Sequence, residues 1–590
     1  MRVVFRPLLG VLLVSSLLFN ACRSDDKPAF DPWDNSVTVR ISGDPESLDY
    51  LTITDGKSTM IYRQINMPFA DFDPATQEMV PVLAKTLPVV TEITEGDRAG
   101  LVSYEFEIRD EAVWPNGSPV TGNDILFTYK LMHNPIKPSM YAGQLRRVKE
   151  VVVNAENPKK FTLYSQPYVM AGPSYSNMAP LPAYVYDPNK VMDQFSLDQL
   201  RTDTTLKNNA DLQGLAEAMG SAEYLRSPEI IKGSGPYELS EWTTGQEVVL
   251  TKKANWWGDQ FAGEERLFKA MPNKVVYKIV PDINAAVAMM KNDEIDVISM
   301  MDWTTFLNEK EKADFQEQVN FFTPDLYAMR MMNFNTSKGK LSDKRVRRAI
   351  THLFDFDEIN EAVWYGYSQP IASPVYPTKS AYNTNLNTLK FDAAKAKSLL
   401  EDAGWKDTNG NGIVDKEING ETVEMELELA YGNGNADYEA VATIFADDAK
   451  EAGVNIKPRP MESSAYLAHL KSREFDMAFS AIRDYPFNMD PAGKWHTRGP
   501  SNYMGFGTPE SDALIIKLRQ TVDPAEQDKL SKELQAIIYD EQPGIFIGVD
   551  KDRMVVDKRF GEITVYGLSP GFSINEFNGN AAIAVSSSQN

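Results

Sequence analysis

The sequence contains little that could form covalent or metal cross-links. It has a single cysteine, Cys22, so no internal disulfide can form. Its four histidines, His133, His352, His469 and His496, are scattered along the chain and none lies near the cysteine. A zinc site needs Cys or His ligands at short, regular spacings, and the chain has no such pattern. We therefore expect no metal and no cofactor.

Positive charge is also scarce. The 590 residues include 60 Lys and Arg against 83 Asp and Glu, which gives a formal net charge of −23. A surface of this sign repels nucleic acid, and no basic stripe in the sequence offsets the repulsion. We expect no nucleic-acid partner. The length exceeds what one hydrophobic core supports, so we expect several domains.

Catalytic signatures are missing as well. The sequence has no G-x-S-x-G, no nucleophilic cysteine motif, no H-E-x-x-H and no P-loop. Paired carboxylates are unavoidable in so acidic a chain, and a glycosidase would need two of them at a defined separation across a cleft. We expect no enzymatic activity; a lipid-anchored hydrolase stays open as an alternative.

The N-terminus has the pattern of an export signal. Arg2 and Arg6 precede an apolar run at residues 8–19, which is typical of a secretory signal. The run is shorter than the roughly 20 apolar residues of a membrane-spanning helix. Ala21 directly precedes Cys22, and this junction resembles a bacterial lipobox, although Asn20 departs from the commonest pattern.

The lipobox resemblance implies cleavage before Cys22 and lipidation of that residue. We expect a signal peptide at 1–21 and a lipidated tether at 22–36. Several acyl chains anchor a protein to a membrane far better than one. The predicted location is the cell envelope of a Gram-negative bacterium, facing the periplasm, with surface exposure possible. A plain cleaved signal with an incidental thiol is the alternative.

Two longer stretches carry a family resemblance. Residues 109–132 read RDEAVWPNGSPVTGNDILFTYKLM, in which Thr121 is placed to cap a helix and Asp124 lies in its first turn. Residues 232–257 read KGSGPYELSEWTTGQEVVLTKKANWW and predict a hairpin of two strands. Both resemble motifs of the family 5 extracellular solute-binding proteins, the peptide- and nickel-binding components of ABC importers. Weaker matches follow in the family's order as far as residue 548.

Two further segments show clear periodicity. A strand at 274–280, a helix at 283–292 and a strand at 295–300 predict a parallel βαβ unit. Ser342 is expected to cap a helix whose apolar residues, such as Val346, recur at helical spacing. The cationic run at 344–348 is then expected to form the solvated face of that helix.

The resemblance implies an α/β, periplasmic-binding-protein type II-like two-lobed fold with an additional small α+β side domain. We expect a monomer that closes over its ligand by a hinge motion. Residues 199–228 match no motif of the family, and their role stays open. The predicted parts are lobe I at 37–75, 228–325 and 546–590, the side domain at 76–227, and lobe II at 326–545.

Residues 475–503 resemble the family segment that lines the cleft between the lobes. In peptide-binding members an Asp of this segment holds the α-ammonium of the ligand by a charge-assisted contact. The best match is Asp484, followed by Tyr485, and the rival is Asp490. A carboxylate that only caps a turn is the alternative for Asp484. Arg483 lies near the position of the usual cleft tryptophan and would suit an anionic group.

The remaining candidates are aromatic. Trp495 and Tyr503 could line a pocket, with core or rim positions as the alternative. The expected ligand is an oligopeptide, held through its backbone as an added strand and delivered to the permease subunits of an ABC transporter. A metal chelate or an oligosaccharide is the alternative ligand.

The segment 407–415, DTNGNGIVD, resembles a calcium-binding loop. It has oxygen-bearing residues at positions 1, 3, 5 and 9 and glycine at position 6. Ile418 occupies position 12, where a calcium loop has a bidentate glutamate. We favour a solvated turn over a metal site.

Overall fold

The computed structural model describes residues 35–53, 55–337 and 339–579. The predicted signal peptide, the lipidation site Cys22 and nearly all of the predicted tether lie outside the described residues. Within the described ranges, no helix combines the length and the apolar character needed to cross a membrane.

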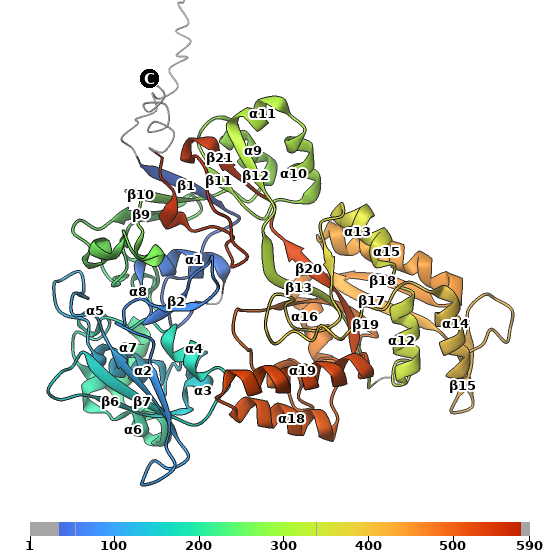
Figure 1. Cartoon of the computed structure of the whole chain (residues 1–590), viewed down its shortest axis with the longest axis horizontal. Helices are drawn as coiled ribbons and strands as arrows, with labels where there is room; N and C mark the ends of the chain where they lie inside the picture. The colour runs from blue at the N-terminus through green and yellow to red at the C-terminus, as the bar shows by residue number, and fades with distance from the viewer. Residues whose placement is uncertain (1–34, 54, 338, 580–590) are drawn as a thin grey trace, which may run out of the picture.

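A seven-stranded sheet forms the centre of the first lobe (Figure 1). Strand β1 (Ser36–Ile41) pairs in parallel with both β10 (Lys274–Ile279) and β11 (Val297–Ile298). Helix α9 (Ile283–Lys291) connects these two strands, so the predicted parallel unit is confirmed. The predicted hairpin is confirmed too, and it consists of β8 (Tyr237–Thr243) and β9 (Glu247–Lys252). Two strands from later in the chain complete the sheet, β12 (Val319–Phe322) and β21 (Met554–Asp557).

A six-stranded sheet forms the centre of the second lobe, with the order β14-β20-β13-β19-β17-β18. Its strands are β13 (Asp325–Phe334), β14 (Gln369–Pro370), β17 (Glu426–Gly432), β18 (Asn455–Met461), β19 (Met477–Arg483) and β20 (Gly544–Lys551). Successive side chains of a strand point to opposite faces, so each face has its own core. Met332 packs with helices on one face, and Met331 packs with helices on the other.

Different helices cover these two faces. The helices on the Met332 face are α12 (Lys344–His352), α13 (Phe356–Trp364), α14 (Ala393–Asp402) and α15 (Ala436–Ala449). The helices on the Met331 face are α18 (Pro509–Gln520) and α19 (Pro524–Glu541), which lie nearest to the first half of the chain in Figure 1.

Helix α12 differs from its sequence-based expectation in two respects. It begins after Asp343, whose side chain accepts a hydrogen bond from the backbone of Arg345, so Ser342 is not the cap. Arg347, predicted to lie on a solvated face, is only 3% exposed. Its guanidinium donates to backbone carbonyls that include those of Leu341 and Glu541. The arginine is buried because it satisfies carbonyls at the end of another helix.

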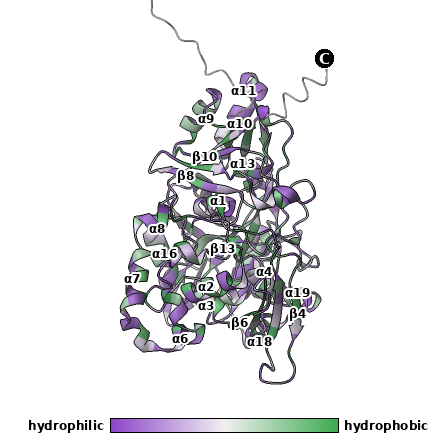
Figure 2. Cartoon of the chain, turned by 90° about the vertical axis from the view of Figure 1, so that its left-hand side faces the viewer, coloured by the Kyte–Doolittle hydropathy of each residue, from purple (hydrophilic) through white to green (hydrophobic). Residues whose placement is uncertain are grey.

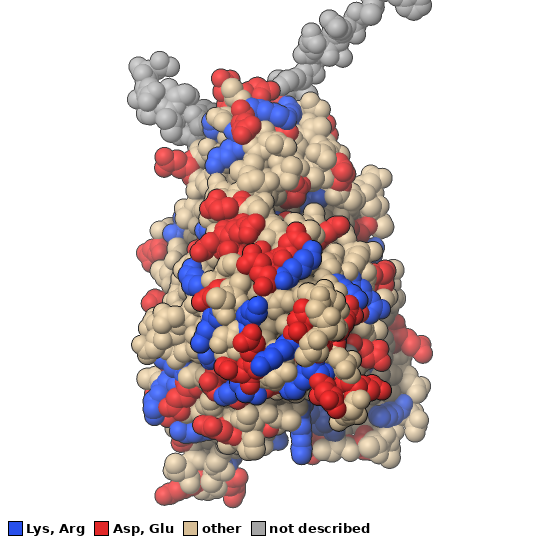
Figure 3. All heavy atoms as spheres, turned by 90° about the vertical axis from the view of Figure 1, so that its right-hand side faces the viewer, with Lys and Arg blue, Asp and Glu red and all other residues tan. Residues whose placement is uncertain are grey.

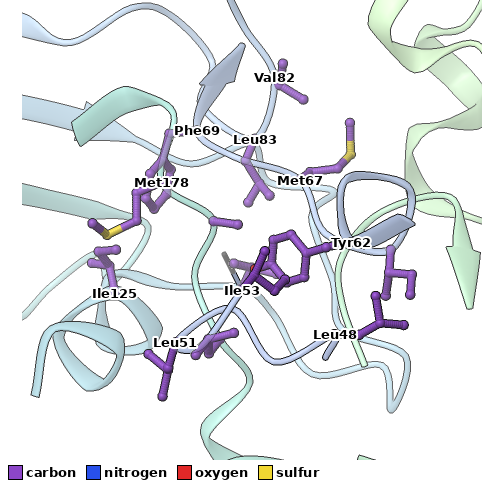
Figure 4. Close-up of a cluster of buried hydrophobic side chains, with 14 of the residues drawn as sticks. Leu48, Leu51, Ile53, Tyr62, Met67, Phe69, Val82, Leu83, Ile125 and Met178 are labelled. Atoms are coloured by element: carbon purple, nitrogen blue, oxygen red, sulfur yellow. The ribbon is translucent and has the colours of Figure 1, made fainter. Parts of the chain in front are cut away.

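The side domain contains a four-stranded antiparallel sheet, in the order β4-β5-β7-β6. Its strands are β4 (Val89–Glu92), β5 (Val102–Glu107), β6 (Val148–Val153) and β7 (Lys160–Ser165). Helix α2 (Gly122–Met132) packs nearby, and Thr121 and Asp124 form the predicted cap as a reciprocal capping box. The domain shares one hydrophobic core with the first lobe, where Tyr62 lies among residues that include Ile125 and Met178 (Figure 4).

Residues 199–228, unmatched in the sequence, form short helices on this shared core. They include α6 (Leu197–Thr202), α7 (Ala210–Ala218) and α8 (Ala222–Arg226). Leu200, Leu212 and Leu215 are buried against the core. Both hydrophilic and hydrophobic residues are visible along α7 in Figure 2, as expected for a helix that packs on one side only.

The chain crosses between the two large sheets twice. The first crossing joins β12 to β13, and the second joins β20 to β21. The two crossings are hydrogen-bonded, because the backbone N–H of Asp552 donates to the carbonyl of Pro324 at 2.9 Å. The second crossing comes after the expected boundary at 546, since β20 stays in the second sheet as far as Lys551. The other domain boundaries stay predictions.

Candidate functional site

Strand β19 has an open edge. On one side it pairs with β13 along its whole length, from Met477 to Arg483. On the other side β17 pairs only with Met477 and Ala478, so among the described residues no strand covers 479–483 there. Arg483 pairs with Ala328 near the start of β13, which brings the open end of β19 close to the crossing between the sheets.

Aromatic rings connect this end of β19 to the first half of the chain. Tyr485 is 47% exposed and stacks on Phe487, with ring centroids 5.5 Å apart. Phe487 in turn stacks on Phe72 of β2 (Ala70–Phe72) at 5.4 Å. Across the same junction, burial raises the pKa of the Tyr141 phenol, and the neighbouring Tyr485 phenol raises it further. The loop after β19 therefore lies between the lobes.

Asp484 is fully engaged by the protein itself. Its Oδ1 accepts from Lys379 Nζ at 2.8 Å and from the backbone N–H of Tyr485 at 2.8 Å. Its Oδ2 accepts from the backbone N–H of Tyr376 at 3.0 Å. The side chains of Lys379 and Asp484 are 6% and 5% exposed. The carboxylate thus has a buried cationic partner, and its role toward a ligand stays a prediction.

Asp490 joins the side domain to the second lobe. Its Oδ2 accepts from Arg519 Nε at 3.0 Å and from the Tyr168 hydroxyl at 3.2 Å. Burial, followed by the charge of Asp490, raises the pKa of the Tyr168 phenol. The backbone reinforces the bridge, because the N–H of Val169 donates to the carbonyl of Arg519 at 2.8 Å.

The free charges of this segment are positive. Arg483 is exposed, and no described carboxylate forms an ion pair with it. Lys494 is half-buried and likewise forms no ion pair with a described residue, while its ammonium lies 5.9 Å from the Trp495 ring centre. Burial lowers the pKa of Lys494 to about 8. Elsewhere on the second lobe, Lys and Arg are interspersed among Asp and Glu (Figure 3).

The two remaining predicted residues, Trp495 and Tyr503, pack against hydrophobic clusters of the second lobe. Trp495 is only 6% exposed and packs edge-to-face on Phe506, with ring centroids 5.7 Å apart. Tyr503 is half-buried and packs against a small buried cluster that includes Phe475. Trp495 thus has a core position and Tyr503 a partly exposed one, and a role of either toward a ligand stays a prediction.

A cavity of about 290 Å³ lies inside the second lobe. It is bounded by the junction of α12 and α13, the end of α19 and strand β20, with Phe354, Ile371 and Phe546 in its walls. None of the predicted ligand residues lines it. We therefore base the candidate site on the open edge of β19 and the loop that follows it.

The segment that resembles a calcium loop uses its carboxylates internally. The two oxygens of Asp407 accept from the backbone N–H groups of Gly410 and Gly412, at 2.7 and 3.0 Å. Asp415 accepts from the backbone and the hydroxyl of Thr408. Among the described residues, no group of three or more His, Cys, Asp or Glu side chains could hold a metal ion.

Two sheet-centred lobes, joined by paired crossings and with an open strand edge at their junction, define a bilobal binding protein. The chain belongs to the family 5 bacterial extracellular solute-binding proteins: the family model "Bacterial extracellular solute-binding proteins, family 5 Middle" matches residues 78–503. This is a family of solute-binding proteins and not of enzymes, which confirms the prediction that the chain is not an enzyme.

Relatives span nearly the whole chain. The oligopeptide-binding protein AppA of Bacillus subtilis is 25% identical over 93% of this chain and 94% of its own length. The structure of that protein with a nonapeptide has a TM-score of 0.67 at 21% identity, covering 92% of this chain and 98% of AppA. The structure of NikA from Brucella suis with Fe(III)-EDTA has a TM-score of 0.73 at 18% identity, covering 92% and 99%. The predicted two-lobed α/β fold is confirmed.

Several residues at the junction were not predicted from the sequence. Lys379, Phe487 and Phe72 lie in loops or at strand ends, where no periodicity marks them. Lys379 is 105 positions before Asp484, so nothing local indicates the pairing. For Phe487 the one available signal was its place within the matched segment 475–503.

Proposed function

We propose that this protein is a lipid-anchored solute-binding protein that captures oligopeptides between its lobes and delivers them to an ABC transporter. The single observation that carries the proposal is the open edge of β19 at the junction between the lobes. An extended peptide can add to such an edge as a further strand, so that its backbone supplies the affinity. The names of relatives such as AppA point in the same direction.

Binding would favour closure of the lobes. A guest on the β19 edge touches the second lobe and, through rings such as Tyr485 and Phe72, also the first half of the chain. Only contacts that are better in the closed form shift the equilibrium toward it. The transporter would then recognise the closed form, and side chains of the peptide would lie in hydrated space that tolerates variety.

Native mass spectrometry of freshly purified protein tests the ligand class. We expect adducts with the masses of short peptides, which disappear after denaturation and refolding. The strand-addition geometry is tested by titrating the refolded protein with a peptide recovered in this way and with its backbone N-methylated form. Because N-methylation removes the N–H donors, it should weaken binding at least about tenfold. Equal affinity for the two forms would reject strand addition.

The anchor is tested separately from the ligand. Growth with an alkyne-bearing fatty acid should label the wild-type protein, and the Cys22→Ser variant should lose the label. The variant should still bind peptide, because none of the residues proposed to contact the peptide is Cys22 or its sequence neighbour. Labelling that survives the substitution would contradict lipidation at this residue.

A non-peptide solute is the second candidate. The exposed Arg483 favours it, because a guanidinium suits the carboxylates of a metal chelate. NikA of Brucella suis, whose structure contains Fe(III)-EDTA, has the same fold. A thermal-shift panel of peptides, nickel chelates and oligosaccharides separates the candidates, since only a bound class raises the melting temperature by mass action.

A further inference from the structure

The segment after the open edge has an unusual distribution of charge for so acidic a protein. Its two carboxylates, Asp484 and Asp490, are each paired with a cation of the protein itself, Lys379 and Arg519. Its cations Arg483, Lys494 and Arg498 form no ion pair with a described residue. The charge left free for a guest at this place is therefore positive, although the whole chain carries −23.

The Asp484 pair is closed to a competing ammonium. Lys379 Nζ donates to Asp484 at 2.8 Å and also to the carbonyl of Phe487 at 2.8 Å, so one ammonium holds both ends of the loop. A ligand ammonium would have to displace it and leave a buried lysine without a counter-charge. Uncompensated buried charges are strongly unfavourable, so this exchange is disfavoured. These contacts make Asp484 a residue that holds the loop in place and not one that binds a ligand.

Arg483 has the opposite properties. It is the last residue of β19, it is exposed, and it lies at the end of the edge that is free to receive a strand. A guanidinium can hold a carboxylate through two parallel hydrogen bonds, which fixes its orientation as well as its charge. Lys494, later in the same segment, also forms no ion pair with a described residue and lies against the Trp495 ring.

We infer that the guest presents a carboxylate to Arg483, and that no ligand ammonium binds at Asp484. This inference rests on the proposed function and specifies the chemistry of its ligand. The carboxylate can be the C-terminus of a peptide or part of a metal chelate, which share the same chemistry. The sequence-based expectation that Asp484 holds an α-ammonium is replaced by recognition of the opposite charge.

A randomised pentapeptide library made in four end forms tests the inference. The forms have a free or acetylated N-terminus, combined with a free or amidated C-terminus, and each competes for binding to refolded wild-type protein. Acetylation should change the apparent Kd by less than about threefold, whereas amidation should weaken it about tenfold or more, which is about 1.4 kcal/mol. Arg483→Gln should abolish the effect of amidation. Arg498→Gln, which alters another exposed arginine of the segment, should preserve it.

The possible outcomes separate this inference from the proposed function. If acetylation weakens binding and amidation does not, the inference is overturned while peptide capture stands. If no form of the library binds, the peptide part of the proposed function fails. In that case binding of Fe(III)-EDTA is measured for the wild type and for Arg483→Gln. Binding that the substitution abolishes supports the carboxylate inference. No binding, or binding that the substitution leaves unchanged, overturns it.

Discussion

Removal of the cation at Asp484 should destabilise the second lobe severely. In Lys379→Met, the Asp484 carboxylate keeps its two backbone donors but loses its buried counter-charge, and the Phe487 carbonyl loses a donor. Both charged side chains are almost inaccessible, at 6% and 5% exposed. Breaking such a pair costs about 3–5 kcal/mol, because the remaining charge is left uncompensated.

The measurement is urea unfolding of wild type, Lys379→Met, Asp484→Asn and the double variant. Because the remaining charge disappears in the double variant, its loss should be at least about 2 kcal/mol smaller than the sum of the two single losses. Lys517→Met is the control, since its partner Glu526 is 3.2 Å away and the two side chains are 60% and 36% exposed. That change should cost at most about 1 kcal/mol. A Lys379→Met loss as small as the control would refute the role of the pair.

Three further predictions concern other features of the segment and its surroundings. Trp495→Ala should cost about 3–5 kcal/mol of unfolding free energy, because it leaves a large void beside Phe506; a loss under about 1 kcal/mol would contradict a core position. Because the pKa of Lys494 is lowered to about 8, its positive charge is present below that pH and is lost above it. Affinity for a carboxylate ligand should therefore fall as the pH rises through about 8, and Lys494→Gln should flatten this dependence in titrations; an unchanged pH profile would exclude Lys494 from binding. Millimolar calcium should leave the melting temperature unchanged relative to EGTA, because Asp407 is occupied by backbone donors; a dose-dependent rise would indicate a metal site.

The sequence predicted local structure well where neighbouring residues determine it. The cap of Thr121 and Asp124, the hairpin that begins at Tyr237 and the parallel unit around α9 all depend on residues close together in the chain. The two-lobed fold was then indicated by the order of the family motifs. Each match is weak, but many matches in the same order as in the family together indicate the family's topology.

The partners of buried charged residues could not be predicted in the same way. Arg347 looked solvated because its neighbours are cationic, yet its partners include Glu541, 194 positions later. Asp484 looked available to a ligand because its partner Lys379 is 105 positions earlier, and no local pattern indicates that the two residues pair. Contacts over such separations follow from the folded topology and leave no periodic signal in the sequence. The pattern therefore predicted a candidate ligand segment but not which of its charges are paired within the protein.

The bond between Asp552 and Pro324 has a consequence for how occupancy is signalled. Since the two crossings are tied to each other by this bond and by the ion pair of Lys551 with Asp325, we expect them to move together as one hinge. The degree of closure would then be described mainly by the tilt of one lobe against the other. Guests of different bulk would set different values of that tilt, so a membrane partner could distinguish empty, productive and oversized complexes without touching the guest.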